Sequence, residues 1–312
     1  MQNILLLGGS GFLGKNIIIK LLSYGYFRII VIDKVNNFES DYKDKIIYYN
    51  KSLNDTDSIF NIIEKENITI IIHCISLLLP ASDLNQYLTD MSQIMEPSVK
   101  IIDYCAMKRV KFIYISSGGT IYGDKQNVFN EEEFASPISH YGLSKQQMEN
   151  VIDFYHRRFG LDYIILRPSN VYGYGQNIYG NQGLIAVLIG KMLNNESVIV
   201  YGDGSNIRDY IFVDDFAYYI AEILNNDIKN MIINIGSGIG HTINQIISYV
   251  ESAGNKKINV EYTDSRKNDV ISVVLDISKL NALLPYKQKS IEEGINAFYK
   301  KIVMNSKTYK DK

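Results

Sequence analysis

A tyrosine and a lysine four residues apart could carry out proton transfer in this chain. They are Tyr141 and Lys145 in YGLSK, which opens a helical pattern running through QQMENVIDFYHRRFG. This spacing places both side chains on one helix face. Because a cation stabilises a phenolate, we expect Lys145 to lower the pKa of Tyr141 toward working pH. The pair predicts a general acid/base that moves a hydroxyl proton, and an ordinary surface helix is the alternative.

The stretch ISSGGTIYGD, Ile115 to Asp124, is a second candidate for chemistry. It joins a strand-like run to small residues and offers hydroxyl groups at Ser117 and Thr120. Two adjacent glycines between apolar runs usually mark only a turn. The stretch is either a hairpin tip or the floor of an active site, and these residues alone leave both interpretations open.

A glycine-rich turn near the N-terminus predicts a dinucleotide site. GGSGFLG carries Gly8, Gly11 and Gly14 at a spacing of three, after a strand-like run and before a helical one. Such a turn lets the backbone approach a pyrophosphate at the positive end of a helix. Asp33 ends the second strand-like run, where its carboxylate would bind ribose hydroxyls and repel a 2′-phosphate. The sequence therefore favours NAD over NADP, although Lys34 weakens the preference, and an ordinary βα turn is the alternative.

The elements around these residues indicate a Rossmann-type α/β fold. Short β-rich runs such as RIIVIDK and ITIIIHCI alternate with longer helical patterns. Unalternated apolar runs suit strands buried on both faces, and intervening helices make such strands parallel. We expect a doubly wound parallel sheet in an NAD-binding domain over 1–166. A smaller mixed α/β substrate domain is expected over 167–312, with part of 209–235 returning to the first domain.

Composition argues against several classes of function. The 312 residues are 46% hydrophobic and carry a net charge of −2, so no excess of positive charge favours nucleic acid or an anionic membrane. No segment approaches the roughly 20 apolar residues of a membrane span, and the N-terminus lacks the basic region of a signal peptide. Cys74 and Cys105 indicate reduced core thiols, and with four scattered histidines they predict no metal site. We expect a cytoplasmic protein.

Several motifs together resemble the extended short-chain dehydrogenase/reductase family, in its NAD-dependent sugar epimerase/dehydratase branch, and are similar to its UDP-glucose 4-epimerases. They run in family order from about residue 4 to residue 276: GGSGFLG, VID, SSGGTIYG, YGLSK, LRPSNVYGYGQ, VYGDGSNIRDYIFVDD, NIGSG and RKND. The resemblance implies that Tyr141 and Lys145 are the catalytic pair. It implies that NAD is held by Gly8, Gly11, Phe12, Leu13, Gly14, Asp33 and Lys145.

The same resemblance implies a substrate and a partner. The substrate is a nucleoside diphosphate sugar, whose diphosphate matches the positions of Asn170, Arg208 and Arg266. Guanidinium groups suit paired phosphate oxygens, although each of the three side chains could instead be structural. The expected partner is a second copy of the chain, in a homodimer formed through the helix that carries Tyr141.

The chain departs from the family at the position of the catalytic Ser or Thr, whose hydroxyl normally shares the substrate's proton with the tyrosine. Four residues before Tyr122, the usual Ser or Thr is Gly118, so Ser117 and Thr120 become the candidates for catalysis. Thr120 is the better one, because alternation along an extended segment points it to the same side as position 118. The dehydratases carry an Asp-Glu pair at Gly119 and Thr120, and its absence disfavours a dehydratase.

Two further departures leave the substrate open. Leu78 stands where the epimerases carry a Lys, and QIMEP, 93–97, stands where NVxGT is usual. The leading hypothesis is an NAD-dependent 4-epimerase of a nucleotide-activated hexose, with a role in polysaccharide biosynthesis implied by resemblance. A one-way reductase of an NDP-4-keto-6-deoxyhexose is the first alternative. The second is a nucleotide-sensing protein that has lost catalysis, which Gly118 favours and YGLSK opposes.

Overall fold

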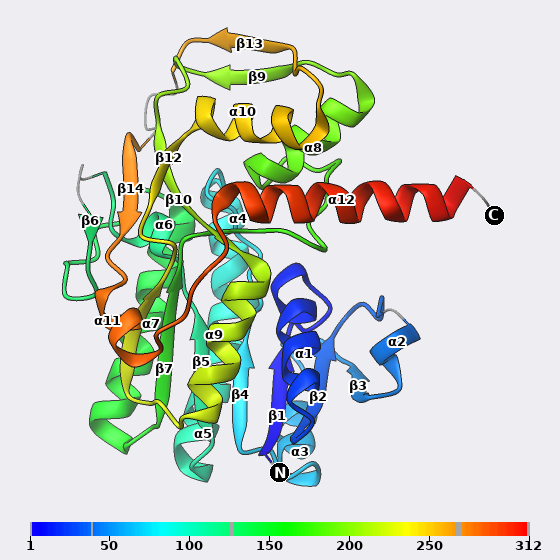
Figure 1. Cartoon of the computed structure of the whole chain (residues 1–312). Helices are drawn as coiled ribbons and strands as arrows, with labels where there is room; N and C mark the ends of the chain where they lie inside the picture. The colour runs from blue at the N-terminus through cyan, green and yellow to red at the C-terminus, as the bar shows by residue number, and fades with distance from the viewer. Residues whose placement is uncertain (1, 39, 125–127, 266–269, 311–312) are drawn as a thin grey trace. The chain divides into compact units, whose positions relative to one another are not determined.

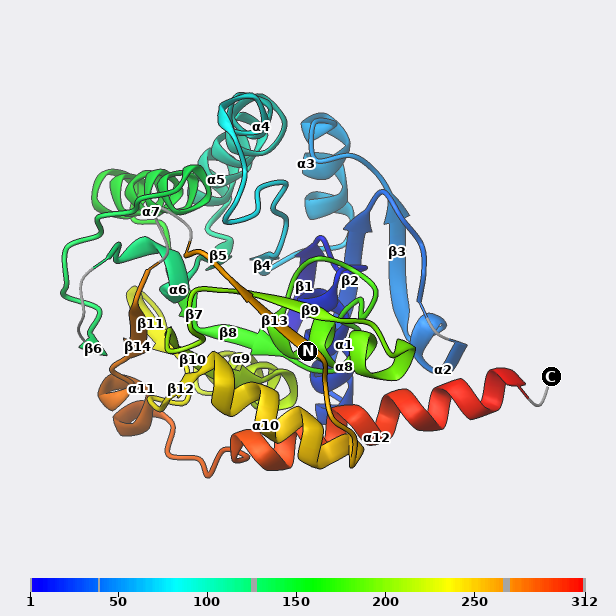
Figure 2. The same ribbon diagram turned by 90° about the horizontal axis from the view of Figure 1, so that it is seen from above.

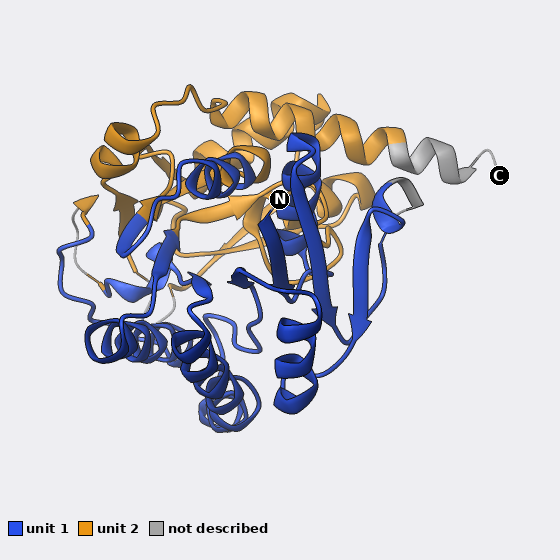
Figure 3. Cartoon of the chain, turned by 90° about the horizontal axis from the view of Figure 1, so that it is seen from below, with its two compact units in different colours: residues 1–123, 131–167, 217–233 blue, residues 124–130, 168–216, 234–312 orange. Residues whose placement is uncertain are grey.

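The chain divides into two compact units, coloured in Figure 3. The computed structural model describes residues 2–38, 40–124, 128–265 and 270–310. Unit 1 comprises 1–123, 131–167 and 217–233, and unit 2 comprises 124–130, 168–216 and 234–312. Each unit therefore takes in segments far apart in the sequence. That unit 1 serves the cofactor and unit 2 the substrate stays a prediction.

A seven-stranded sheet forms the middle of unit 1 (Figure 1). The strands, in spatial order, are β3 (Ile46–Asn50), β2 (Phe27–Asp33), β1 (Gln2–Leu7), β4 (Ile70–His73), β5 (Lys111–Ile115), β7 (Tyr163–Pro168) and β11 (Met231–Ile235). Every pairing from β3 to β7 is parallel. The predicted doubly wound sheet is thus confirmed. Its strand order reverses between β1 and β4, where ligands bind in this class of fold.

Helices cover both faces of this sheet, because most residues of its strands are apolar and have to be buried on either side. Seen from above, α3, α5 and α7 lie along one face, and α1 and part of α9 lie along the other (Figure 2). Ile62 of α3, Ile101 of α5 and Met148 of α7 share one apolar core with the strands. The helices of this part of the chain are α1 (Phe12–Tyr24), α2 (Ser40–Lys43), α3 (Thr56–Lys65), α4 (Leu84–Asp90), α5 (Glu96–Lys108), α6 (Gly118–Ile121), α7 (His140–Phe159) and α9 (Val213–Asn225).

A π-helical turn, η1 (Met91–Met95), joins α4 to α5. Pro97 lies just beyond it, within QIMEP, and a proline inside a helix lacks an N–H and clashes with the carbonyl four residues earlier. A π turn is a known way to accommodate an interruption of the α-helical ladder. The segment QIMEP, which differs from the family's usual sequence, therefore overlaps a π turn that begins directly after Asp90.

His73 ends β4 in the core of unit 1. It is 1% exposed, and its Nε2 lies 2.9 Å from Ser98 Oγ. No hydrogen-bond partner is found for Nδ1 among the described residues. Burial, with the nearby Lys145 charge, lowers the pKa of His73 from 6.5 to about 3. The imidazole is therefore neutral in the folded protein at working pH.

We expect the protein to lose stability as the pH falls below 6.5. In that range the unfolded chain binds a proton at His73 that the folded chain does not bind, so the stabilisation is present above pH 6.5 and is lost toward pH 3. The loss should reach about 2 kcal/mol near pH 5. Urea unfolding near pH 7.5 and near pH 5 measures it. His73→Gln should remove most of the difference between the two conditions, and a difference of the same size in the variant would contradict this origin.

Unit 2 is a smaller mixed α/β unit, as predicted. In it β10 pairs in antiparallel fashion with β12 and in parallel with β8 and β14, while β9 pairs with β13. Residues of α8, α10 and α12 share a second apolar core with β8, β9 and β10. Its elements are β6 (Val128–Phe129), β8 (Asn170–Tyr172), α8 (Leu184–Asn194), β9 (Val198–Tyr201), β10 (Ile207–Phe212), β12 (Gly240–Thr242), α10 (Ile243–Gly254), β13 (Val260–Thr263), β14 (Ser272–Leu275), α11 (Ser278–Leu283) and α12 (Ile291–Lys310).

Two findings bear on the expectations from composition. Cys74 and Cys105 are both free thiols; Cys105 is fully buried, whereas Cys74 is partly exposed. Within the described part of the chain, no helix combines the length and the apolar character needed to cross a membrane.

Candidate active site

Helix α7 begins so that Tyr141 and Lys145 lie in its first two turns. The Ser139 side chain caps the helix by accepting a hydrogen bond from the Gly142 N–H at 3.1 Å. The ammonium of Lys145 lies 5.5 Å from the centre of the Tyr141 ring. Gly142 allows a close approach, since a Cβ there would stand 2.7 Å from the carbonyl oxygen of Thr120. The structure thus brings the predicted pair together.

Lys145 is held in a buried position. Its side chain is 5% exposed, its Nζ donates a hydrogen bond to the Ile115 carbonyl at 2.9 Å, and it lies 4.8 Å from the centre of the Tyr114 ring. Burial lowers the pKa of Lys145 to about 8, against the opposing effect of the Asp90 carboxylate. The ammonium is therefore close to its titration point at working pH.

Tyr141 differs from the sequence-based expectation. Burial raises the pKa of its phenol above 10.0, because desolvation disfavours the phenolate, and a hydrogen bond with Ser117 acts in the lowering direction. The expected net lowering of the Tyr141 pKa is thus not what the structure shows. Ser117 is the group that favours the phenolate.

ISSGGTIYGD is neither a hairpin tip nor an extended segment. After β5 ends, Ser117 precedes the short helix α6, so the backbone is helical where alternation had been assumed. The argument that Thr120 follows the side of Gly118 along an extended chain is therefore wrong. Instead, Thr120 Oγ1 donates to Ser117 Oγ at 3.0 Å, and Ser117 in turn lowers the pKa of the Tyr141 phenol. The two hydroxyls form a chain with Ser117 next to the phenol.

A buried ion pair supports this group, and the sequence analysis missed it. Glu149 and Arg167 are both nearly fully buried, with Arg167 Nη2 2.7 Å from Glu149 Oε2. Glu149 also accepts a hydrogen bond from Ser116, and Arg167 Nη1 donates to the Tyr122 hydroxyl at 2.9 Å. These contacts tie α7 to β5, α6 and β7. The available signal was a charged Arg167 ending an apolar strand, where a charge needs a partner.

The glycine turn fits closely between β1 and β4. Gly8 has a φ of +83°, and a Cβ on it would stand 2.8 Å from Cγ1 of Ile75, which follows β4. A Cβ on Gly14 would stand 2.6 Å from the Gly8 carbonyl oxygen. A Cβ on Gly11, by contrast, would meet only the Gly8 oxygen, at 3.5 Å. The turn is therefore closely packed at Gly8 and Gly14 and open at Gly11.

The start of α1 is suited to an anion. Phe12 and Leu13 are its first residues, and its first turn contains no acidic side chain, so its positive end is not neutralised. Asp33 at the end of β2 accepts hydrogen bonds from the Ser10 N–H at 3.0 Å and the Val35 N–H at 3.2 Å. The Asp33 carboxylate is thereby fixed beside the turn.

The arrangement has clear counterparts among known proteins. Residues 4–236 match the model of the NAD dependent epimerase/dehydratase family. The chain belongs to this family. It is 31% identical to the UDP-glucose 4-epimerase of Thermotoga maritima, solved with UDP-glucose, with a TM-score of 0.89 over 98% of this chain and 100% of that one.

Two further members of the epimerase/dehydratase family differ in their reported activities. The UDP-glucose 4-epimerase of Thermus thermophilus, solved with NAD, is 26% identical, with a TM-score of 0.87 over 96% of this chain and 98% of that one. The dTDP-4-dehydro-6-deoxyglucose reductase of Escherichia coli is 28% identical over 96% of this chain and 98% of its own length. Family membership therefore gives the cofactor and leaves the reaction to be argued.

The residues of the turn fit NAD, the cofactor of this family. The open face at Gly11 and the uncompensated start of α1 suit a pyrophosphate, and the Asp33 carboxylate suits the hydroxyls of the adenosine ribose. When bound, NAD would supply the acceptor for a hydride. The roles of Gly8, Gly11, Phe12, Leu13, Gly14, Asp33 and Lys145 in holding it remain predictions residue by residue.

Unit 2 holds the residues predicted to bind the diphosphate. Asn170 starts β8, and its Nδ2 donates to the Asp209 carbonyl at 2.8 Å. Arg208 lies in β10, where its Nη1 donates to the Ile207 carbonyl at 2.8 Å. Arg266 lies outside the described residues. Contact of any of the three with substrate stays a prediction.

Asp209, next to Arg208, is a residue that the sequence analysis missed. It is 1% exposed, and its carboxylate accepts hydrogen bonds from the backbone N–H groups of Ser237 at 2.8 Å and Gly238 at 3.1 Å. A Cβ on Gly236 would stand 2.4 Å from this carboxylate. Asp209 therefore fixes the NIGSG segment beside β10, which explains why that segment needs its first glycine.

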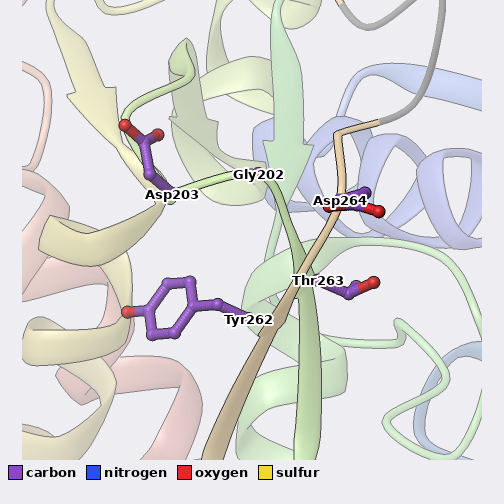
Figure 4. Close-up of a pocket in the computed structure, with 5 residues that line it drawn as sticks. All are labelled: Gly202, Asp203, Tyr262, Thr263 and Asp264. Carbon is purple, nitrogen blue, oxygen red and sulfur yellow. The ribbon is translucent and has the colours of Figure 1, made fainter.

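An open hollow at the ends of β9 and β13 in unit 2 is lined by Gly202, Asp203, Tyr262, Thr263 and Asp264 (Figure 4). In this view the side chains of Asp203 and Asp264 lie on opposite sides of the paired strands. Asp203 already accepts a hydrogen bond from the Ser205 N–H at 2.9 Å. Across the described ranges, no group of three or more His, Cys, Asp or Glu side chains could hold a metal ion. We assign no chemistry to this hollow.

Proposed function

We propose that this protein is an NAD-dependent 4-epimerase of a nucleoside diphosphate hexose. The observation that carries the proposal is the position of the Tyr141 ring, 5.5 Å from the buried ammonium of Lys145, with Ser117 lowering the pKa of the phenol. A phenol placed in this way can take the proton of a C4 hydroxyl as its hydride passes to the nicotinamide. Return of the hydride to the other face of the 4-keto sugar would complete epimerisation.

Reduction of an NDP-4-keto-6-deoxyhexose is the second candidate. It needs the same tyrosine and lysine, and the similarity to the reductase of Escherichia coli along nearly the whole chain favours it. The two reactions differ in cofactor use. An epimerase regenerates its NAD within each turnover, whereas a reductase consumes one NADH for each product molecule and must exchange the cofactor.

We further propose that the protein acts in the cytoplasm as a homodimer. The dimer surface would include α4. Its residues Leu84 and Leu88 are 56% and 53% exposed, and Met91, which directly follows the helix, is 41% exposed. Their spacing of four and three residues places them on one face. Leu77 and Leu79, just before this helix, are also exposed. An exposed apolar face of this kind is typical of an interaction surface.

The function can be tested with C4-deuterated UDP-, dTDP- and GDP-hexoses, without added cofactor. We expect the purified protein to carry NAD through gel filtration and to interconvert C4 epimers with the deuterium retained at C4. In a second assay, with NADH and a 4-keto sugar added, consumption of NADH without epimerisation would instead establish the reductase. Failure to turn over any sugar of the panel in either assay would overturn both candidates.

A further inference from the structure

Asp90 is a buried carboxylate that the proposed mechanism does not use. It ends α4, directly before the π turn, and is 2% exposed. The structure gives its side chain one hydrogen bond, from Ser144 Oγ to Asp90 Oδ2 at 2.7 Å. Ser144 immediately precedes Lys145 on α7, so the carboxylate faces the helix that carries Tyr141 and Lys145.

The other buried carboxylates of the described residues have more partners than Asp90. Two of them pair with an arginine: Glu66 with Arg28 and Glu149 with Arg167. The other two each accept hydrogen bonds from two or more donors. Asp209 accepts from the N–H groups of Ser237, Gly238 and Leu275, and Asp215 accepts from the Tyr286 hydroxyl and the Lys289 N–H. A buried charge that lacks compensation costs several kcal/mol. A cation near Asp90 would balance it.

Lys145 is the buried cation whose pKa responds to the charge of Asp90. It is itself buried, its hydrogen bond goes to an uncharged carbonyl, and no carboxylate within the described ranges lies in ion-pair contact with it. Burial lowers the pKa of Lys145, and the strongest effect in the opposite direction comes from Asp90. Both groups are buried, and the Asp90 carboxylate is hydrogen-bonded to Ser144, the residue next to Lys145 on α7.

The other titratable groups around Lys145 do not replace Asp90. They are His73 of β4, Cys74 after it, Tyr114 of β5, and Tyr141 and Glu149 of α7. Burial raises the pKa of the Cys74 thiol to about 12 and that of Tyr114 well above 10.0, and it keeps His73 neutral, so none of these three is charged at working pH. The charge of Glu149 is already paired with Arg167. Asp90 is the remaining negative charge in this group.

We propose that Asp90 is a positioning residue, the counter-ion that keeps Lys145 positively charged while Tyr141 exchanges the proton of the sugar. The roles of Tyr141 and Lys145 in this statement rest on the proposed function. The electrostatic effect of Asp90 on Lys145 does not depend on the proposed function, because it is a property of the folded chain. The π turn at Met91–Met95 follows Asp90 directly, at the junction where the helix changes its winding.

Asp90→Asn tests the proposal, because Asn keeps the shape and an oxygen acceptor for Ser144 while removing the charge. The titration of Lys145 is followed by NMR in protein with 13C-labelled lysine, its signal being assigned by its loss in Lys145→Met. We expect the midpoint to fall by about one pH unit or more from about 8. Since Lys145 acts as a cation, kcat should decline with rising pH at a correspondingly lower pH in the variant.

Two controls separate charge from packing. Ser144→Ala removes the hydrogen bond and keeps the carboxylate, so the Lys145 midpoint should move much less than in Asp90→Asn. Asp153→Asn removes an exposed carboxylate of α7 that pairs with Arg157, and it should leave the midpoint unchanged. If Asp90→Asn fails to fold, Asp90→Ser also removes the charge, and the same fall in the Lys145 midpoint is expected in that variant.

The outcomes distinguish this inference from the proposed function. A lowered Lys145 midpoint in Asp90→Asn supports the counter-ion, even if the wild type turns over no nucleotide sugar, in which case only the proposed function fails. An unchanged midpoint overturns the counter-ion, whatever the activity. A loss of kcat by the same factor at every pH, with the midpoint unchanged, would mean that Asp90 acts through packing alone.

Discussion

Tyr141→Phe is expected to lower kcat by about 10³-fold or more while leaving NAD bound. The substitution removes only the phenolic oxygen, which is the group that exchanges a proton with the sugar, and general acid/base catalysis is typically worth 10²–10⁴-fold. The ring can keep its place on α7, near the ammonium of Lys145. Turnover of the C4-deuterated sugar and the NAD released from denatured protein give the two measurements.

A matched control for this variant lies on the same helix. Tyr155→Phe makes the same change fourteen residues further along α7, roughly 21 Å away at 1.5 Å per residue. It should leave kcat within about twofold, because Tyr155 is far from the reacting atoms. Near-normal activity of Tyr141→Phe would remove Tyr141 from the mechanism.

The sequence predicted the fold well, because the apolar runs of its strands can be recognised without knowledge of the tertiary contacts. Unalternated apolar runs such as RIIVIDK fit only strands with both faces covered, and the structure buries Ile30, Val31 and Ile32 completely. The start of α7 was also predictable, since Ser139 is a good capping residue placed before a helical pattern. Local rules and the global fold agree in these segments.

The site was harder to predict where its geometry depends on contacts between distant segments. Asp90 lies in the polar stretch NQYLTDMSQ, which resembles an exposed helix, yet it is buried and hydrogen-bonded to Ser144 of α7. The pairing of Glu149 with Arg167 joins a helix to a strand eighteen residues away. The helical turn α6 replaced an expected extended segment, because two adjacent glycines carry little information on backbone conformation.

That turn decides which hydroxyl should matter, and Ser117→Ala is expected to be the more damaging of two alanine substitutions. Ser117 lowers the pKa of the Tyr141 phenol, whereas Thr120 is hydrogen-bonded to Ser117. Loss of one such hydrogen bond to a charged form is worth about 10²-fold in kcat. Thr120→Ala should cost about tenfold or less, because Ser117 keeps its bond to Tyr141.

The pH dependence of kcat distinguishes a catalytic effect from a structural one. Burial raises the pKa of Tyr141, and the Ser117 hydrogen bond opposes that shift, so its removal should raise the pKa further. Because the phenolate is the base, the rise of kcat with pH should move to higher pH in Ser117→Ala and move little in Thr120→Ala. If instead Thr120→Ala shows the larger shift, the hydroxyl chain runs in the opposite order, with Thr120 next to the phenol. If neither variant is slower than the wild type, Tyr141 works without a hydroxyl partner. Gly118 would then stand in a site that does not need the catalytic Ser or Thr of the family.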